Sequence, residues 1–334
     1  MNAPDTITDE WFPAAHSSAV VAGSWHPFEL LDERYVLVCS SLGEVSVYRD
    51  TCPHRGAQLS LGSFDGERIQ CGYHGWEFES SGRCVHQPAH PDRNPPATSD
   101  LSAIATREGY GLWWVCVGDA PRELPRFPAY EAYPDLSVYP EPAVVQSSGP
   151  RLVENFLDLA HFPFVHADYL GQVPHTAVER YGVDVVDDEL QLTDVTVWQP
   201  NPGPRATEGG PVAYNYSVSH PFAAVLTKVP SEHDGGDLGG FSILIVASPI
   251  HETACVVWRV VTVRDPDVDR DAQLAFNRTI FEQDIPIVES QLPKRLPVGP
   301  KAEIHQPADA GSLAYRKWLI ARGTRYGTVS QEAT

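Results

Sequence analysis

The chain has 334 residues, enough for about two domains, and 42% of them are apolar, as is usual for globular proteins. It carries 44 Asp and Glu against 24 Lys and Arg, and this formal charge of −20 argues against nucleic acids and anionic membranes as partners. The first residues are acidic and lack the apolar segment of a signal peptide, and no apolar run approaches the ~20 residues of a spanning helix. We therefore expect a cytoplasmic protein.

The first part of the chain, from Trp11 to about residue 120, has the pattern of a small all-β domain. Short β-branched and aromatic runs at 35–41, 45–50 and 111–119 are separated by turn residues. The stretch 69–84 continues this alternation and contains a hairpin turn. Residues 1–10 are too polar to predict a regular element.

Two short loops of this domain offer two thiolates and two imidazoles. The four residues are Cys52, His54, Cys71 and His74. Thiolates and imidazoles together suit zinc or an iron–sulfur cluster, so both centres fit the ligand types. Glycines at 56, 72 and 75 favour the bulkier cluster, because they let the loops pass close to it without side-chain clashes. The other four cysteines do not form a disulfide framework in so long a chain, and we expect free, buried thiols.

Residues 120–150 are rich in proline and aromatic residues and lack periodicity, which is typical of a linker lying on the next domain. We place the domain boundary near residue 138, giving one domain at 1–138 and a second at 139–334. The second domain begins with a short strand and then a helix-period segment at 151–171.

Five strand-like runs follow this segment, separated by acidic or glycine-rich turns. They lie at 181–186, 190–198, 212–222, 241–250 and 254–263. Strands in this succession predict an antiparallel meander with helices on one face, an α+β layer. A helix at 271–291 and a last short helix at 312–322 complete the predicted domain.

A second candidate metal site lies in the segment Asp158, His161 and His166. On a helix, Asp158 and His161 would share a face, whereas His161 and His166 would lie roughly 140° apart. The two histidines can meet at one ion only if the helix ends or bends between them. Pro163 lies between them and provides that break. The alternative is a pair of hydrogen-bonded core histidines beside a helix end.

Two motifs give the chain a family resemblance over almost its whole length. CPHRG and CGYHGW resemble the cluster signature of Rieske [2Fe–2S] proteins, and NFLDLAHFPFVH resembles the mononuclear iron motif of Rieske non-heme iron oxygenases. The extra disulfide of the respiratory branch would need cysteines near Ala57 and at Tyr73, which are absent. The resemblance is thus to the oxygenase or ferredoxin branch, with a potential near the low end of roughly −150 to +300 mV.

The resemblance implies roles for individual residues. Cys52 and Cys71 would hold one cluster iron, and His54 and His74 the other. His161, His166 and a downstream carboxylate would hold Fe(II). Asp284 matches the family position best, ahead of Glu282 and Glu289, although Pro286 suggests a local kink. Asp158 would bridge His161 to a cluster histidine of a neighbouring subunit, and Asn155, one turn earlier, would face the iron pocket.

The resemblance also implies an architecture: a Rieske domain followed by a helix-grip-like catalytic domain, in a short, homotrimeric terminal oxygenase α subunit. Electrons from NAD(P)H would arrive through a separate reductase, with or without a ferredoxin, because no nucleotide-binding GxGxxG turn is present. Such an enzyme uses O2 to hydroxylate or oxidatively demethylate a small aromatic or heterocyclic substrate. Substrate contacts are expected from strands in 195–260, where Tyr214, Tyr216, His220 and Phe222 are candidates for the pocket or for the core.

Two alternatives remain for the function. One is a ring dioxygenase that performs cis-dihydroxylation, which these motifs do not separate from demethylation. The other is a Rieske electron-transfer protein without oxygenase activity. The roughly 200 residues beyond the first domain, which carry the second His-His-Asp set, argue against a simple electron carrier.

Overall fold

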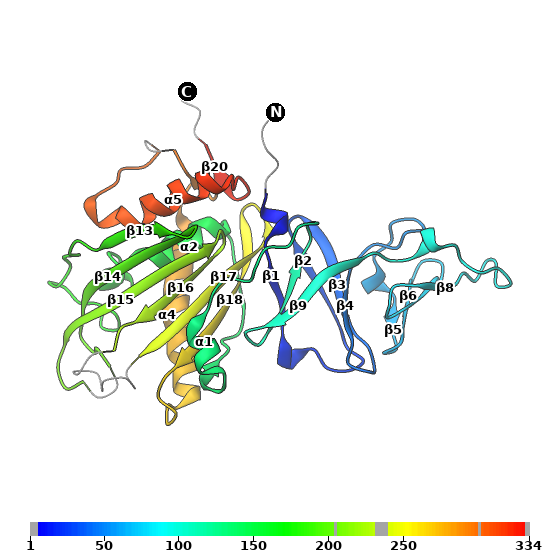
Figure 1. The fold of residues 1–334 in the computed structure, drawn as a ribbon, viewed down its shortest axis with the longest axis horizontal. Coiled ribbons are helices and arrows are strands. Elements are labelled where there is room, and N and C mark those ends of the chain that lie inside the picture. The colour runs from blue at the N-terminus through cyan, green and yellow to red at the C-terminus, as the bar shows by residue number, and fades with distance from the viewer. Residues whose placement is uncertain (1–5, 204–205, 231–239, 300–301, 331–334) are drawn as a thin grey trace. The chain divides into compact units, whose positions relative to one another are not determined.

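The computed structural model describes residues 6–203, 206–230, 240–299 and 302–330. The chain divides into two compact units, one of residues 8–123 and one that contains residues 124 onward (Figure 1). Each unit has the predicted character, all-β in the first and α+β in the second. The functional division that we place at residue 138 stays a prediction.

The first unit contains a six-stranded antiparallel sheet in the order β1-β10-β9-β4-β3-β2. Its strands are β1 (Phe12–His16), β2 (Trp25–Leu30), β3 (Glu33–Cys39), β4 (Val45–Arg49), β9 (Ala103–Gly109) and β10 (Leu112–Cys116). In β3, Tyr35 through Cys39 are all buried, so this strand contributes strongly to the core of the unit. The predicted strands at 35–41, 45–50 and 111–119 are therefore found.

A second, four-stranded sheet in the first unit carries the two loops with the cysteine and histidine pairs. Its strands are β5 (Ser63–Phe64), β6 (Arg68–Gln70), β7 (Glu77–Glu79) and β8 (Cys84–His86), paired in sequence order. The first loop lies between β4 and β5, and the second connects β6 to β7. Cys52 and Cys71 belong to the same apolar cluster as Ile69 and Phe78, so the loops are anchored in the core.

The second unit is an antiparallel meander with strand order β11-β18-β17-β16-β15-β14-β13. Its long strands are β13 (Gly182–Val186), β14 (Glu189–Gln199), β15 (Gly210–His220), β16 (Ala223–Lys228), β17 (Phe241–His251) and β18 (Ala254–Val263). Burial alternates along β15, whereas β18 is buried almost throughout because both of its faces are covered. This confirms the predicted meander and α+β class.

Sequence patterns missed two strands of this sheet, β16 and a short strand in the predicted linker. The predicted run 212–222 crosses a turn, since β15 ends at His220 and β16 begins at Ala223. The missed short strand is β11 (Ser137–Val138), whereas β12 (Ala143–Val145) is the short strand predicted at the start of the second domain. Both pair with β18 at the edge of the sheet. Short edge strands beside prolines carry too few residues for a period to be recognised.

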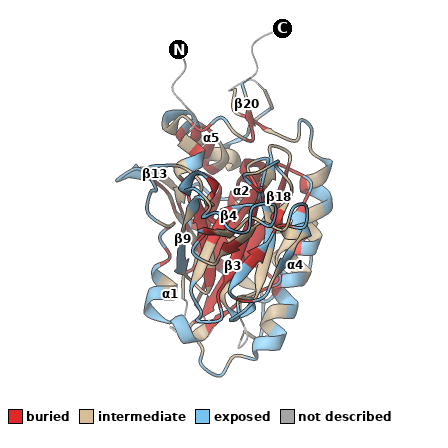
Figure 2. Ribbon diagram, turned by 90° about the vertical axis from the view of Figure 1, so that its right-hand side faces the viewer, coloured by how far each residue is buried: buried red, intermediate tan, exposed pale blue. Residues whose placement is uncertain are grey.

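Helices supply the rest of the second unit. They are α1 (Pro128–Ala132), α2 (Gly149–Leu157), α3 (Phe162–Val165), α4 (Arg270–Ser290) and α5 (Ala310–Arg322). In Figure 2, α4 lies along one face of the buried sheet and presents its outer side to solvent. It continues across Pro286 to Ser290, so the predicted kink does not end the helix. No helix in the described ranges is both long and apolar enough to cross a membrane.

The predicted helical segment at 151–171 is wrong over much of its length. The helix α2 ends at Leu157, and Asp158 already has an extended backbone with φ −88° and ψ 130°. A separate one-turn helix, α3, begins after His161 with Pro163 in its first turn. Pro163 therefore opens a new turn, where its missing N–H is harmless, and does not break a longer helix.

A buried network of charges fixes α2 to the C-terminal part of the unit. On α5, the Nε and Nη2 nitrogens of Arg316 donate to the two carboxylate oxygens of Glu154, at 2.5 and 2.8 Å. Glu303 accepts from Arg151 at 2.8 Å and also from Arg316. All but Glu303 are buried, so each charge depends on its partners. The network holds the helix that leads directly into the segment of His161 and His166.

We predict that Arg316→Met destabilises the second unit by about 3 kcal/mol, because it leaves Glu154 as a buried carboxylate without its main partner. Urea unfolding followed by tryptophan fluorescence would measure this. Arg295→Met is the matched control, since the Arg295–Glu252 pair in the same unit is about 40% exposed at 2.9 Å and should be worth less than about 1 kcal/mol. Equal, small effects in both variants would contradict the structural role of the network.

Candidate metal centres

The two loops of the first unit have the same backbone construction. The amide of Cys52 donates to the carbonyl of Ala57 at 2.7 Å, and the amide of Gly56 donates back to the carbonyl of Cys52 at 2.9 Å. The second loop repeats both bonds, from Cys71 to Trp76 and from Gly75 to Cys71, at 2.9 and 3.0 Å. The glycines that close each turn have φ of +74° and +68°, a conformation that disfavours other residues. Both loops therefore present their cysteine and histidine in the same way.

The four side chains of these loops fit a cluster with two thiolate and two imidazole ligands. Both sulfurs are buried, and the rings of His54 and His74 lie 4.4 Å apart. The His54 Nδ1 atom is buried and has no hydrogen-bond partner in the described part of the chain, as expected of a nitrogen reserved for a metal. Trp76 stacks on His54 with parallel rings 4.6 Å apart and holds its orientation.

The protonation of Cys52 depends on its burial. Burial, reinforced by the neighbouring Cys71, raises the pKa of Cys52 to about 11. Metal ligation requires the thiolate, so binding must displace this proton. All six cysteines of the chain are free and buried, which confirms the predicted absence of a disulfide framework.

The second candidate centre joins two segments of the second unit that are far apart in sequence. His161 and His166 flank the one-turn helix α3, and Asp284 projects from α4. The two Nε2 atoms lie 3.2 Å apart, and Asp284 Oδ1 lies 3.5 Å from His161 Nε2 and 3.2 Å from His166 Nε2. The structure thus brings together the three residues that the sequence analysis grouped as iron ligands.

These three distances are those of ligands on one face of an ion. Ligands about 2.1 Å from a metal and at right angles to one another are separated by about 3 Å. Because all three pairs are this close, the three residues could hold one ion together from one side. Asp284 Oδ1 is buried and accepts no hydrogen bond from any described residue, as expected of an oxygen that ligates a cation. The donor set of two imidazoles and one carboxylate suits non-heme Fe(II).

The outer nitrogens of both imidazoles have side-chain partners. His161 Nδ1 lies 3.2 Å from Asp158 Oδ2, and His166 Nδ1 lies 2.8 Å from Gln283 Oε1. Each partner accepts a hydrogen bond from Nδ1–H, which keeps the proton on Nδ1 and leaves the Nε2 lone pair directed at the centre. Sequence reasoning missed Gln283, because glutamine is not a usual iron ligand and 283 and 284 point in different directions on a helix. Only its position beside Asp284 hinted at a role.

The alternative carboxylates lie elsewhere. Glu282 is exposed, and the carboxylate of Glu289 accepts from the amide of Gln146 at 2.8 Å. Asp158 contacts His161 without sharing a helix face with it. Its other oxygen accepts from the amide of Ala160 at 2.9 Å, which fixes the turn between α2 and α3.

A cavity of about 90 Å³ opens beside the three residues. Its lining is mainly aromatic and aliphatic, with Phe156, Leu226 and Phe276 among the contributors. The polar contributors are Asn155, Tyr214, Gln273 and Asn277. Asn155 and Tyr214 are thus at the cavity, whereas Tyr216, His220 and Phe222 are buried in the core. The amides of Gln273 and Asn277 were not anticipated, because they lie one turn apart on a helix that sequence patterns linked only to the metal.

Both parts of the chain match known protein families. Residues 10–105 match the Rieske [2Fe-2S] domain, and residues 145–324 match the vanillate O-demethylase oxygenase C-terminal domain. The chain is 37% identical to the probable methylxanthine N7-demethylase NdmC of Pseudomonas sp. (strain TJI-51) over 69% of this chain and 81% of that protein. It is 30% identical to the methylxanthine N1-demethylase NdmA of Pseudomonas putida over 87% and 80%.

A solved structure is similar over the same extent. The structure of NdmA from Pseudomonas putida CBB5 with caffeine shares 27% identity with this chain and has a TM-score of 0.79. The similarity covers 98% of each chain, so both units have counterparts there.

We predict that Asp284→Ala lowers the iron content by one atom per chain and leaves the visible absorption of the cluster unchanged. The reason is that Asp284 supplies the only carboxylate within reach of both Nε2 atoms in the described ranges. Glu282→Ala, two residues away on the same helix, is the matched control and should keep its full iron content. Iron loss from Glu282→Ala, with normal iron in Asp284→Ala, would move the third ligand to Glu282.

Proposed function

The chain belongs to the Rieske non-heme iron oxygenases, and on that premise we propose that it oxidatively demethylates a small N-methylated heterocycle of the methylxanthine class. The observation that carries this proposal is the face formed by His161, His166 and Asp284 beside a largely apolar cavity with amide groups. The names of its relatives NdmC and NdmA support the substrate class.

We assign the cluster to Cys52, His54, Cys71 and His74, and the mononuclear iron to His161, His166 and Asp284. When bound, the cluster supplies electrons one at a time and the iron activates O2 against the substrate. Neither centre needs a nucleotide site on this chain. Electrons reach the cluster from NAD(P)H through a separate reductase, with or without a ferredoxin. We place the enzyme in the cytoplasm.

The residues of the chain have distinct tasks in this reaction. Asp158 and Gln283 each hold a proton on Nδ1 of one histidine, so that both Nε2 atoms face the reaction centre. The apolar lining, including Phe156 and Phe276, excludes water from the reacting methyl group.

The polar groups of the cavity select and orient the substrate. The amides of Asn155, Gln273 and Asn277 can donate to ring carbonyls and accept from ring N–H groups. Asn277 is held in place, since its side chain donates to the carbonyl of Gln273 at 2.9 Å. Because a heterocycle with alternating carbonyl and nitrogen edges needs such partners, these amides favour it over a hydrocarbon ring.

Assembly completes the proposed enzyme. We propose a homotrimer in which Asp158 links His161 to a cluster histidine of the neighbouring chain. A head-to-tail ring of this kind would place a cluster beside every iron. The Asp158 carboxylate is about one-third exposed and so remains accessible to a partner group.

We predict that the purified chain, supplied with NADH and a broad-specificity reductase, releases one formaldehyde per NADH oxidised when given caffeine or theobromine. In this reaction, O2, two electrons and two protons convert one N-methyl group to N–H, and the products are formaldehyde and water. Formaldehyde and the demethylated heterocycle can be quantified together. His161→Ala is the control and should oxidise no substrate.

The same assay separates the alternatives. A cis-dihydroxylating enzyme would give a diol from an aromatic substrate and no formaldehyde from the methylated heterocycles. An electron-transfer protein would become reduced but consume no O2 with any substrate. Either result would overturn the proposed demethylation.

A further inference from the structure

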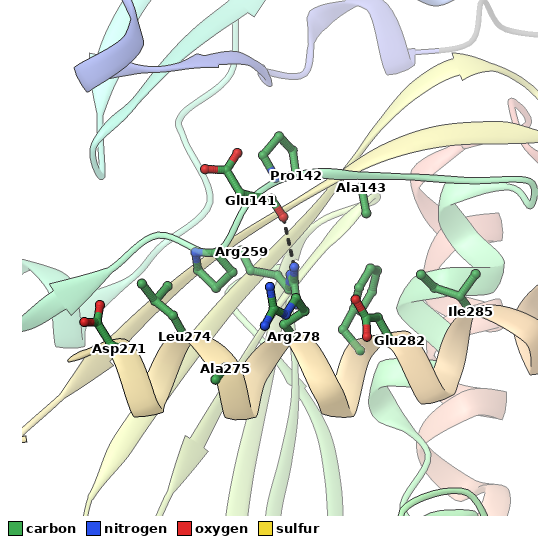
Figure 3. Close-up of a pocket in the computed structure, with 12 residues that line it drawn as sticks. Glu141, Pro142, Ala143, Arg259, Asp271, Leu274, Ala275, Arg278, Glu282 and Ile285 are labelled. Carbon is green, nitrogen blue, oxygen red and sulfur yellow. Dashed lines mark hydrogen bonds between the residues drawn. The ribbon is translucent and has the colours of Figure 1, made fainter. Parts of the chain in front are cut away.

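We propose that a second cavity of the catalytic unit, on another face of α4, binds a small organic monocarboxylate with an apolar body. The cavity has a volume of about 440 Å³ and lies between α4, β18 and the chain at Pro140–Ala143 (Figure 3). It is separate from the cavity beside the candidate iron site, and no residue lines both.

The helix α4 serves the two cavities with different residues. Those that line the second cavity recur at the same helical face: Leu274, Arg278, Phe281 and Ile285. Those that line the cavity beside the iron site lie on another face: Gln273, Asn277, Ile280 and Asp284. A ligand in the second cavity would therefore not contact the reacting substrate.

Arg259 gives the second cavity a buried positive charge. Its side chain on β18 is part of the lining, yet the residue is only 6% exposed. Two of its nitrogens donate to the carbonyls of Asn277 and Glu141, each at 3.0 Å, and its guanidinium lies 4.2 Å from the centre of the Phe281 ring. The Nε atom is buried without a hydrogen-bond partner, and no described carboxylate forms an ion pair with Arg259.

The charge state of Arg259 reflects this setting. Burial lowers the pKa of its guanidinium to about 10, and Glu282 only partly opposes that effect. A buried cation held by carbonyls alone is less stable than one paired with an anion. Anchoring of α4 to the sheet explains the two bonds to carbonyls, but it does not supply the anion that this buried charge lacks.

A second arginine reaches the same cavity. Arg278 is exposed and, within the described part of the chain, forms no ion pair. Within the described part of the chain, neither Arg259 nor Arg278 forms an ion pair, and Arg259 is buried. An anion from outside would complete the site, because a guanidinium is a strong partner for a carboxylate.

The remaining lining defines the class of anion. Leu274, Phe281 and Ile285 offer an apolar wall to an aromatic or aliphatic body. In Figure 3 the Glu141 carboxylate points away from the two arginines and Asp271 lies farther along α4, whereas Glu282 lies beside Arg278. These flanking acids would repel a dianion such as a phosphate ester more than a single carboxylate. A guanidinium binds a carboxylate through two parallel hydrogen bonds.

The test uses the iron-loaded enzyme and two probes of equal shape, 2-naphthoate and the uncharged 2-naphthamide, with affinity measured by calorimetry. We expect 2-naphthoate to bind at least tenfold more tightly than the amide. In Arg278→Gln this preference should fall about tenfold, because the substitution removes one charged hydrogen-bonding partner of the carboxylate. Arg93→Gln, which removes an exposed arginine of the other unit, is the charge-matched control and should bind as the parent does.

Two further variants locate the bound probe. Ala275→Phe fills the second cavity without changing charge and should abolish binding, whereas Ile280→Trp narrows the cavity beside the iron site and should have no effect. Circular dichroism of each variant checks that it is folded. The proposal is overturned by absent binding of 2-naphthoate at millimolar concentration, by equal affinity for both probes, or by loss of binding in Ile280→Trp alone.

Discussion

The structure of the catalytic unit depends on holding three electron-rich atoms within 3.2 to 3.5 Å of one another. Two imidazole nitrogens and a carboxylate oxygen do not collect in a protein interior by their own attraction, because each loses hydration there. The surrounding fold must supply the energy that keeps them together until a cation does so. The fold supplies this energy on two sides of the centre. One source is the buried charges that anchor α2, and the other is the packing of α4 on the sheet.

The two sides are fixed by different interactions. Arg151, Glu154 and Arg316 secure α2, and the turn at Asp158 then directs His161 and His166 inward. On the other side, Arg259 donates to the carbonyl of Asn277 and stacks on Phe281, which sets the position of α4 along β18. Buried charges thus anchor both supports of the centre. The same helix consequently forms a wall of both cavities, and its position matters to each.

Residue types and alternation predict much of this molecule. Cysteine and histidine pairs in glycine-containing loops indicate the cluster, and strand periods indicate the meander, because both depend on local chemistry. Features set by tertiary contacts cannot be predicted from the local sequence. Nothing local tells that α2 ends at Leu157 or that Ala143–Val145 pairs with β18. The turn between β15 and β16 did have a local signal, because a proline such as Pro221 interrupts a strand. Gln283 acquires its role only because α4 brings it to His166.

We propose that the two centres act together, with the cluster of one chain reducing the iron of its neighbour. Co-expression of Cys52→Ser, which keeps its iron face, with His161→Ala, which keeps its cluster, tests it most directly. In mixed rings of random composition, about a quarter of the sites would pair an intact donor with an intact acceptor, and demethylation should rise clearly above that of either variant alone. Background activity in verified mixed trimers would contradict transfer between chains and the bridging role of Asp158.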